Sequence, residues 1–178
     1  IVVGFGRFGQ TVAQLLMTRG VSVTLVDIKP SQIEVSGTFG AKVWFGDGRR
    51  IDLLRRAGAE EAQIIAFCTD DCQIGTKELE PIIAAFPQAA IFLRVFDRRH
   101  LIEVSGLDLA GATRVVFESA VAMGNAALRS LGADDDAIID NERAYRQRDL
   151  DRLAAQSETG DLYAGDSLYR VPHKTPQS

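Results

Sequence analysis

Short apolar runs alternate with longer amphipathic segments along most of the chain. The short runs are rich in β-branched residues, which is typical of buried strands. They predict six strands, at residues 1–3, 21–26, 42–45, 63–68, 91–95 and 113–116. The segments between them repeat apolar residues at helical spacing. They predict helices at residues 8–19, 31–39, 51–57, 73–86, 100–107 and 117–131.

Some of these helices carry signals that fix or weaken them. Gly20 should stop the first helix. The helix at 31–39 should be weak, because it contains Ser36, Gly37 and Thr38. Pro81 must lie near a boundary of its helix or kink it.

Strands that alternate with helices predict a parallel sheet covered on both faces. We therefore expect one α/β domain at residues 1–132, a Rossmann-type doubly wound parallel six-stranded sheet that ends in a crossover helix. Residues 133–156 are charged and should form a helical extension. Residues 157–178 lack periodicity, which predicts a disordered tail.

The glycines of the opening GFGRFG satisfy the G-x-G-x-x-G pattern between a strand and a helix. Gly4 should allow the tight turn, Gly6 a close approach of phosphate, and Gly9 the packing of helix on strand. Asp27 closes the second strand, where its carboxylate can accept ribose hydroxyls. An acid there would repel a 2′-phosphate, which favours NAD or another adenosine nucleotide over NADP.

Further polar residues should reach the same crevice from other loops. Asp47 could accept from an adenine amino group or cap the next helix. The Thr69-Asp70-Asp71 loop could face the ribose and phosphate or act as a cap. Arg94 could pair with phosphate or an aspartate, or lie along a sheet edge. Arg7 could clamp phosphate or contact a partner.

Composition excludes several classes of protein. The chain has 178 residues and a net charge of -4, with both signs interspersed, so no basic surface for nucleic acid is visible. No apolar run approaches the roughly 18 residues that span a bilayer. Cys68 and Cys72 do not form a C-x-x-C motif, so we expect buried and loop thiols rather than a redox or metal pair. The chain does not begin with Met, so we expect a piece of a longer protein.

The sequence offers little for hydride transfer, which needs a general acid or base near the cofactor. His100 is the only histidine of the predicted folded part, and Arg98 and Arg99 precede it. We interpret His100 as a structural residue at a surface or interface. Only a helix and a tail follow the sheet, which leaves no substrate domain, so we expect no enzyme activity.

Several segments together resemble one known family: GFGRFGQTVAQLL, VDIKPSQIE, FGAKVWFGDGRRIDLLRRAGAEEAQII, IFLRVFDRRH and FESAVAMGNAAL. In unbroken order over residues 1–156, they resemble the KTN or RCK-type (TrkA-N) domain. The chain is most similar to the cytoplasmic C-terminal domain of Kef-type potassium:proton antiporters. The resemblance implies nucleotide-binding roles for Gly4, Phe5, Gly6, Arg7, Phe8, Gly9, Asp27, Ile28, Asp47, Gly48, Thr69, Asp70, Asp71 and Arg94.

The resemblance also implies a function. Such domains bind NAD(H) or AMP, form homodimers, and gate the transport domain of the same chain at the inner membrane. The helix at 117–131 resembles the crossover helix, and its small residues allow close approach to a partner or ordinary packing on its own sheet. Glutathione control is implied too, although Glu103 and Ser105 stand where an anionic tripeptide would favour basic residues. A soluble NAD-dependent oxidoreductase and a stand-alone Trk-type uptake subunit remain as alternatives.

Overall fold

The computed structural model describes residues 1–30, 41–70 and 74–159. The chain divides into two compact units, Ile1–Val115 and Val116–Ser178. The helix predicted at 31–39 and most of the predicted tail lie outside the described residues.

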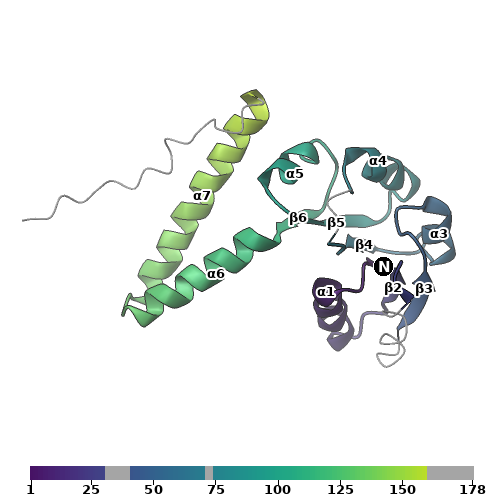
Figure 1. Ribbon diagram of the computed structural model, residues 1–178, viewed down its shortest axis with the longest axis horizontal. Helices are drawn as coiled ribbons and strands as arrows, with labels where there is room; N and C mark the ends of the chain where they lie inside the picture. The colour runs from purple at the N-terminus through teal and green to yellow at the C-terminus, as the bar shows by residue number, and fades with distance from the viewer. Residues whose placement is uncertain (31–40, 71–73, 160–178) are drawn as a thin grey trace, which may run out of the picture. The chain divides into compact units, whose positions relative to one another are not determined.

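The first unit is built on a six-stranded sheet, in which every strand pairs in parallel with its neighbours (Figure 1). Its order is β3-β2-β1-β4-β5-β6, which is the order of a Rossmann fold and agrees with the predicted fold class. The order reverses between β1 and β4, and ligands of such sheets bind at the carboxyl ends of the strands beside this point. The strands are β1 (Val2–Val3), β2 (Thr24–Asp27), β3 (Lys42–Phe45), β4 (Ile64–Phe67), β5 (Ala90–Val95) and β6 (Gly111–Arg114).

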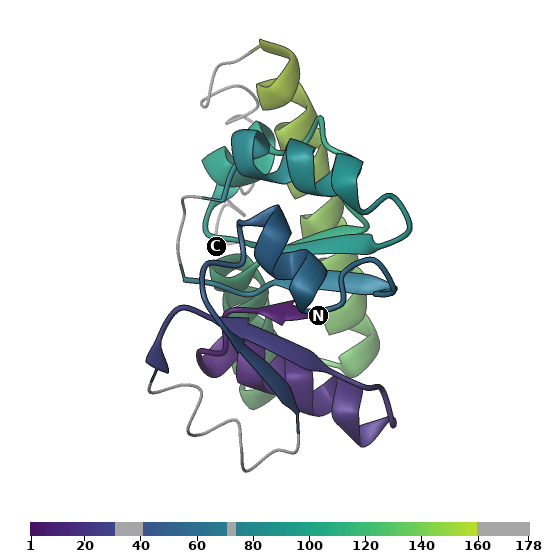
Figure 2. The same ribbon diagram turned by 90° about the vertical axis from the view of Figure 1, so that its right-hand side faces the viewer.

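Helices cover both faces of this sheet (Figure 2). Val2, Leu25 and Ala66 pack on one face with α1 (Arg7–Thr18). The next residues along these strands, Val3, Val26 and Phe67, face the other side. The helices of that side are α3 (Ile51–Arg56), α4 (Thr76–Ala85) and α5 (Arg98–Glu103). Alternate strand residues thus supply two separate cores, as expected for a sheet buried on both sides.

One predicted strand start, and one of the two alternatives given for Pro81, are wrong for identifiable reasons. The strand predicted at 21–26 begins only at Thr24, because the Val21 N–H donates to the Leu16 carbonyl and completes the end of α1. Pro81 lies inside α4 rather than near its boundary. It follows the first turn of the helix and forgoes only one backbone hydrogen bond there.

The elements after β5 also begin earlier than predicted. Asp97 caps α5 by accepting a hydrogen bond from the His100 N–H (2.9 Å), so the helix starts at Arg98. The strand predicted at 113–116 is β6, which ends at Arg114, and α6 (Val115–Ser130) starts at the next residue. Val115 and Val116, predicted in the strand, therefore belong to the helix, an ambiguity that short apolar runs carry.

The second unit contains α6 and α7 (Asp135–Thr159), the latter being the charged helix predicted from the sequence. Arg146 ties the two helices together, because its Nη1 and Nη2 donate to the two carboxylate oxygens of Glu118 at 3.0 and 2.8 Å. The ring of Phe117 stacks on that of Tyr145 with centroids 5.9 Å apart. The side chain of Asn125 also bonds Glu142. α6 has no buried residue of its own, so much of its surface remains free.

Candidate functional site

The loop between β1 and α1 has the geometry that its glycines predict. The Gly4 N–H donates to the Val26 carbonyl (2.8 Å), and the φ of Gly4 is 90°, a conformation that other residues rarely adopt. A side-chain carbon at Gly9 would lie 1.8 Å from the Gly4 carbonyl oxygen, so only glycine lets α1 begin this close to the loop. Gly6, the N-cap of α1, has no side chain with which to bond the first N–H groups of the helix. This helix end therefore offers N–H donors and a positive dipole to an anion.

Asp27 ends β2 beside this loop and is only 8% exposed. Its Oδ2 accepts from the Phe5 N–H at 2.5 Å, and its Oδ1 accepts from the Lys29 N–H at 2.7 Å. Because a carboxylate accepts about four hydrogen bonds, both oxygens keep capacity for ligand hydroxyls. The Phe5 side chain is buried in the core, so Phe5 holds Asp27 through its backbone and does not present its ring to a ligand.

A cavity of about 390 Å³ opens at the carboxyl ends of β1, β2, β3 and β4. This volume is within the usual range for small-molecule sites. Eight of the predicted site residues line it: Gly4, Gly6, Asp27, Ile28, Asp47, Gly48, Thr69 and Asp70. The first unit thus brings together residues from four loops that are far apart in sequence.

Other predicted site residues lie elsewhere. Among the described residues, Phe5, Arg7, Phe8, Gly9 and Arg94 are not part of the cavity lining. Phe5 and Gly9 are buried and shape the loop from behind, while Arg7 is exposed. Asp71 and Cys72 lie outside the described residues.

Two cationic lining residues, Lys29 and Arg49, were missed by the sequence analysis. Each stands two residues beyond a predicted acid, Asp27 or Asp47, and bonds that acid through its own backbone N–H. The sequence feature that could have identified these two cations is the recurrence of Asp-x-Lys and Asp-x-Arg at the ends of two neighbouring strands. These cations lie at the part of the cavity formed by the β2 and β3 loops.

Asp47 does not cap α3, so that alternative is wrong. The N-cap is Arg50, and no side chain bonds the helix start. The Asp47 carboxylate instead pairs with Arg49, whose Nε and Nη2 donate at 2.9 and 2.8 Å. These hydrogen bonds lower the pKa of Asp47 below its ordinary value. Arg49 is thereby fixed at the cavity rim with its guanidinium plane held by two bonds.

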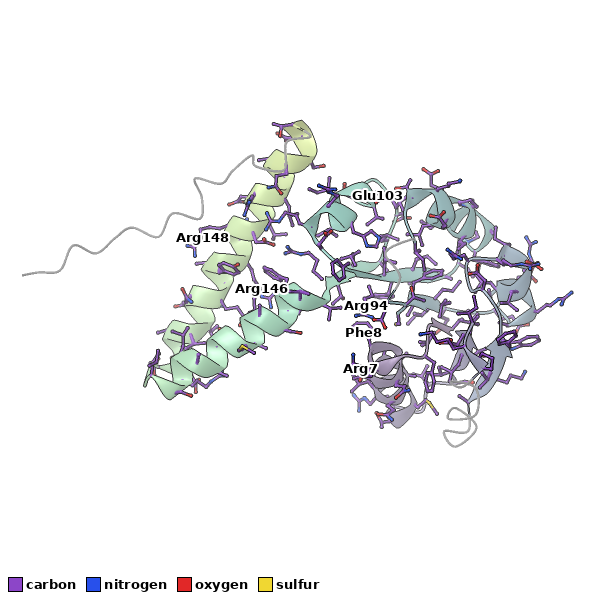
Figure 3. The ribbon with its side chains drawn as sticks, in the orientation of Figure 1. Arg7, Phe8, Arg94, Glu103, Arg146 and Arg148 are labelled. Carbon is purple, nitrogen blue, oxygen red and sulfur yellow. The ribbon has the colours of Figure 1, made fainter. Side chains whose placement is uncertain are left out.

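Arg94 on β5 forms an ion pair with Asp70, and pairing with an aspartate was one of its predicted alternatives. Its guanidinium carbon also lies 5.0 Å from the centre of the Phe8 ring, a cation–π distance, as Figure 3 shows near the start of α1. Arg94 is 19% exposed, whereas Asp70 is 79% exposed. The cation is therefore held in place, and its acidic partner stands in the open at the cavity rim.

His100 has a structural position, as predicted, but it is buried rather than at a surface. Its Nε2 lies 2.8 Å from the Ile74 carbonyl oxygen, and its Nδ1 lies 3.4 Å from the Phe96 nitrogen. An imidazole with its proton on Nε2 satisfies both partners, because Nδ1 then accepts from the Phe96 N–H. His100 thus links the chain before α4 to the start of α5 and does not line the cavity.

Cys68 lines the back of the cavity and is buried. Burial raises the pKa of its thiol to about 11, so the thiol is protonated and unreactive near neutral pH. Within the described ranges, no three His, Cys, Asp or Glu side chains gather as a metal site would require. None of the described helices combines the length and apolar character needed to cross a membrane.

Comparison with known proteins identifies the family. The family model of the TrkA-N domain matches residues 1–118 of the chain. The chain belongs to the TrkA-N domain family. This TrkA-N domain is 35% identical over 167 residues to the glutathione-regulated potassium-efflux system protein KefC of Cronobacter sakazakii, a match that covers 94% of the chain and 26% of the relative. It is 36% identical over 157 residues to a glutathione-regulated potassium-efflux system protein of Haemophilus influenzae, covering 86% and 25%. The chain therefore spans about a quarter of the length of these curated relatives.

Solved structures agree with this assignment. The Kef CTD of Shewanella denitrificans, in AMP bound form, is 34% identical to this TrkA-N domain with a TM-score of 0.75, covering 88% of the chain and 96% of that structure. The TrkA-N domain of the inner membrane protein ybaL from Escherichia coli has a TM-score of 0.63 at 15% identity, which shows the shared fold. The predicted resemblance to the Kef C-terminal domain is confirmed.

Proposed function

We propose that this TrkA-N domain is the regulatory, adenosine-nucleotide-binding part of a Kef-type potassium:proton antiporter. The observation that carries the proposal is the similarity to a Kef CTD in AMP bound form, combined with the cavity at the switch point of the sheet. The relatives are named as potassium-efflux systems, which supports a membrane transport domain as partner. On this proposal the domain lies at the cytoplasmic side of an inner membrane.

The chemistry of the lining supports one placement of the ligand. The ribose hydroxyls donate to Asp27, whose oxygens keep free acceptor capacity. The phosphate lies at the Gly4–Gly9 loop, where the start of α1 supplies N–H donors. The adenine lies between Ile28 and the Asp47-Gly48 loop, and Ile28 offers it an exposed apolar side chain. AMP and NAD(H) both present these groups, and NADP would place a 2′-phosphate against the Asp27 carboxylate.

The domain acts as a sensor and not as an enzyme. A ligand can bias a transport gate only by binding its two states with different affinity, which needs a binding site but no catalytic base. In support, His100, the one histidine among the described residues, bonds the buried Ile74 carbonyl and does not line the cavity. Glutathione is a second effector on this proposal, supported by the names of the relatives.

A homodimer formed through α6 completes the proposal. On the α1 side of β5, Phe92 is 40% exposed and Phe96, just past the strand, is 58% exposed. On α6, Val116 and Met123 are 64% and 75% exposed, seven residues apart on one side of the helix. Such unpartnered apolar surfaces are typical of interfaces. The small residues of α6 support close packing against a second copy: Ala120, Ala122, Gly124, Ala126 and Ala127.

Calorimetric titration of the chain with AMP, NAD, NADH and NADP tests the ligand. We expect saturable binding of AMP or NAD(H), and weaker binding of NADP. Tighter binding of NADP would overturn the role given to Asp27. The oxidoreductase alternative is tested separately, since hydride transfer to any substrate changes nicotinamide absorbance and would replace the sensor proposal with an enzyme. For the Trk-type alternative, the gene decides: apolar spans encoded directly upstream support an antiporter, and a stand-alone gene supports an uptake subunit.

A further inference from the structure

Asp70 is an acid in a place where the proposed ligand brings its own negative charge. A side-chain carbon at Gly6 would have the Asp70 Oδ2 atom as its nearest neighbour, at 3.7 Å. Gly6 is the N-cap of α1, the end at which the proposed phosphate binds. The Asp70 carboxylate thus stands directly over the glycine loop, on the side open to the cavity.

The same carboxylate holds a cation close to the start of α1, where the proposed phosphate binds. Arg94 forms its ion pair with Asp70 through Oδ1, while the Phe8 ring on α1 supports the guanidinium from the side. Phe8 is the second residue of α1, so this contact fixes Arg94 close to the helix start. A guanidinium in this position can serve a carboxylate or a phosphate, since both accept its paired N–H donors.

We propose that Asp70 is a built-in competitor of the ligand's phosphate and thereby sets the affinity of the site. This inference rests on the proposed nucleotide function. Asp70 repels a phosphate at the glycine loop and also holds Arg94, so binding requires the carboxylate to move away and Arg94 to pass from Asp70 to the ligand. Asp70 is 79% exposed and can make this movement, whereas the half-buried, aromatic-supported Arg94 stays in place.

The competitor has a consequence for ligand recognition. A phosphate monoester such as AMP carries about 1.5 to 2 negative charges near neutral pH, whereas adenosine carries none. Removing the charge of Asp70 should therefore strengthen the binding of AMP and leave that of adenosine unchanged. If Asp70 only supported the loop, its removal would change the affinities of both ligands alike. If Asp70 made a favourable contact to the nucleotide, its removal would weaken the binding of AMP.

The test measures the affinity of AMP and adenosine for the wild type and for Asp70→Asn by calorimetry. We expect AMP to bind about threefold to fivefold more tightly to Asp70→Asn, with adenosine within about twofold, since exposed ion pairs are worth up to about one kcal/mol. The gain should shrink as salt is raised. It should also shrink in an Arg94→Gln background, because part of it comes from releasing Arg94.

Asp52→Asn is the matched control. Asp52 is also an exposed acid paired with an arginine, Arg50, but it does not line the cavity. Asp52→Asn should leave the affinity for AMP unchanged. If it raised that affinity as much as Asp70→Asn does, the effect would come from net charge alone, which would overturn the proposal. AMP binding that is unchanged or weakened in Asp70→Asn overturns the competitor role while the nucleotide function stands. If neither protein binds AMP, the competitor role fails, and the proposed function fails with it only if NAD and NADH do not bind either. If only Asp70→Asn binds AMP, the competitor role is supported.

Discussion

At the scale of single residues, Asp27 shows how backbone geometry prepares a side chain for a ligand. The N–H of Phe5, which precedes Asp27 in the chain, donates to its Oδ2. The N–H of Lys29, which follows it, donates to its Oδ1. Charged hydrogen bonds of this kind are worth more than neutral ones. The carboxylate is therefore oriented by the protein before any ribose arrives, which reduces the ordering that binding must impose.

Asp27→Asn should weaken the binding of AMP by about tenfold to a hundredfold, because hydrogen bonds to a charged acceptor contribute about 1.5 to 3 kcal/mol. The amide also turns one acceptor into a donor facing a backbone N–H, so thermal unfolding must first show that the variant is folded at the assay temperature. The decisive comparison uses 2′-deoxy-AMP. Wild type should prefer AMP to its deoxy form, and the variant should have lost most of that preference. An undiminished preference would contradict the role of Asp27.

The sequence predicted correctly the positions of residues that follow from their place in an element. Asp27 and the glycines stand at strand ends and in a helix-opening loop, and parallel strands bring such positions to one edge. It missed Lys29 and Arg49, because their position depends on local turns around Asp27 and Asp47 and not on periodicity. It also could not anticipate that Asp47 would be engaged by Arg49, since both partners lie within one loop.

At the scale of elements, the alternation of patterns predicted the parallel six-stranded sheet correctly, but several element boundaries differ from the predicted ones. Capping decided several of them. Asp97 moved the start of α5, and the Val21 N–H was used to end α1 rather than to begin β2. Each of these hydrogen bonds depends on a single donor or acceptor, so a hydrophobic pattern read over many residues does not reveal it. The pairing of β1 with both β2 and β4 is the part that hydrophobic pattern and chain topology determine.

Gly9→Ala should destabilise the first unit by about 3 kcal/mol, because the added methyl group would collide with the Gly4 carbonyl and push α1 away from β1. Gly106→Ala is the matched control, since a side-chain carbon there meets nothing within 4 Å. It should change the free energy of unfolding by no more than about 0.5 kcal/mol. Urea denaturation of both variants measures the difference. Equal stabilities would show that α1 does not depend on its close contact with the loop.

At the scale of the whole molecule, each unit has an exposed apolar surface among its described residues. In the first unit, α1 packs with residues of β1, β2 and β4. Phe92 of β5 and Phe96 just after it lie on the same face and stay partly exposed. In the second unit, the side of α6 that carries Val116 and Met123 is distinct from the side that meets α7 through Phe117 and Asn125. A regulatory domain that transmits a signal between subunits needs such surfaces, because binding at one site must alter an interface.

Met123→Lys should weaken dimerisation about tenfold or more, because it places a charge in the middle of the apolar side of α6. Met123 is 75% exposed, so the variant should keep the helix content of the wild type in circular dichroism. Ala144→Lys is the matched control: it adds the same charge at an exposed position of α7. Sedimentation equilibrium over a range of concentrations should show dimers for the wild type and the control, and monomers for Met123→Lys at concentrations where the wild type is paired. A wild type that remains monomeric at high concentration, or a Met123→Lys variant that dimerises normally, would rule out α6 as the interface.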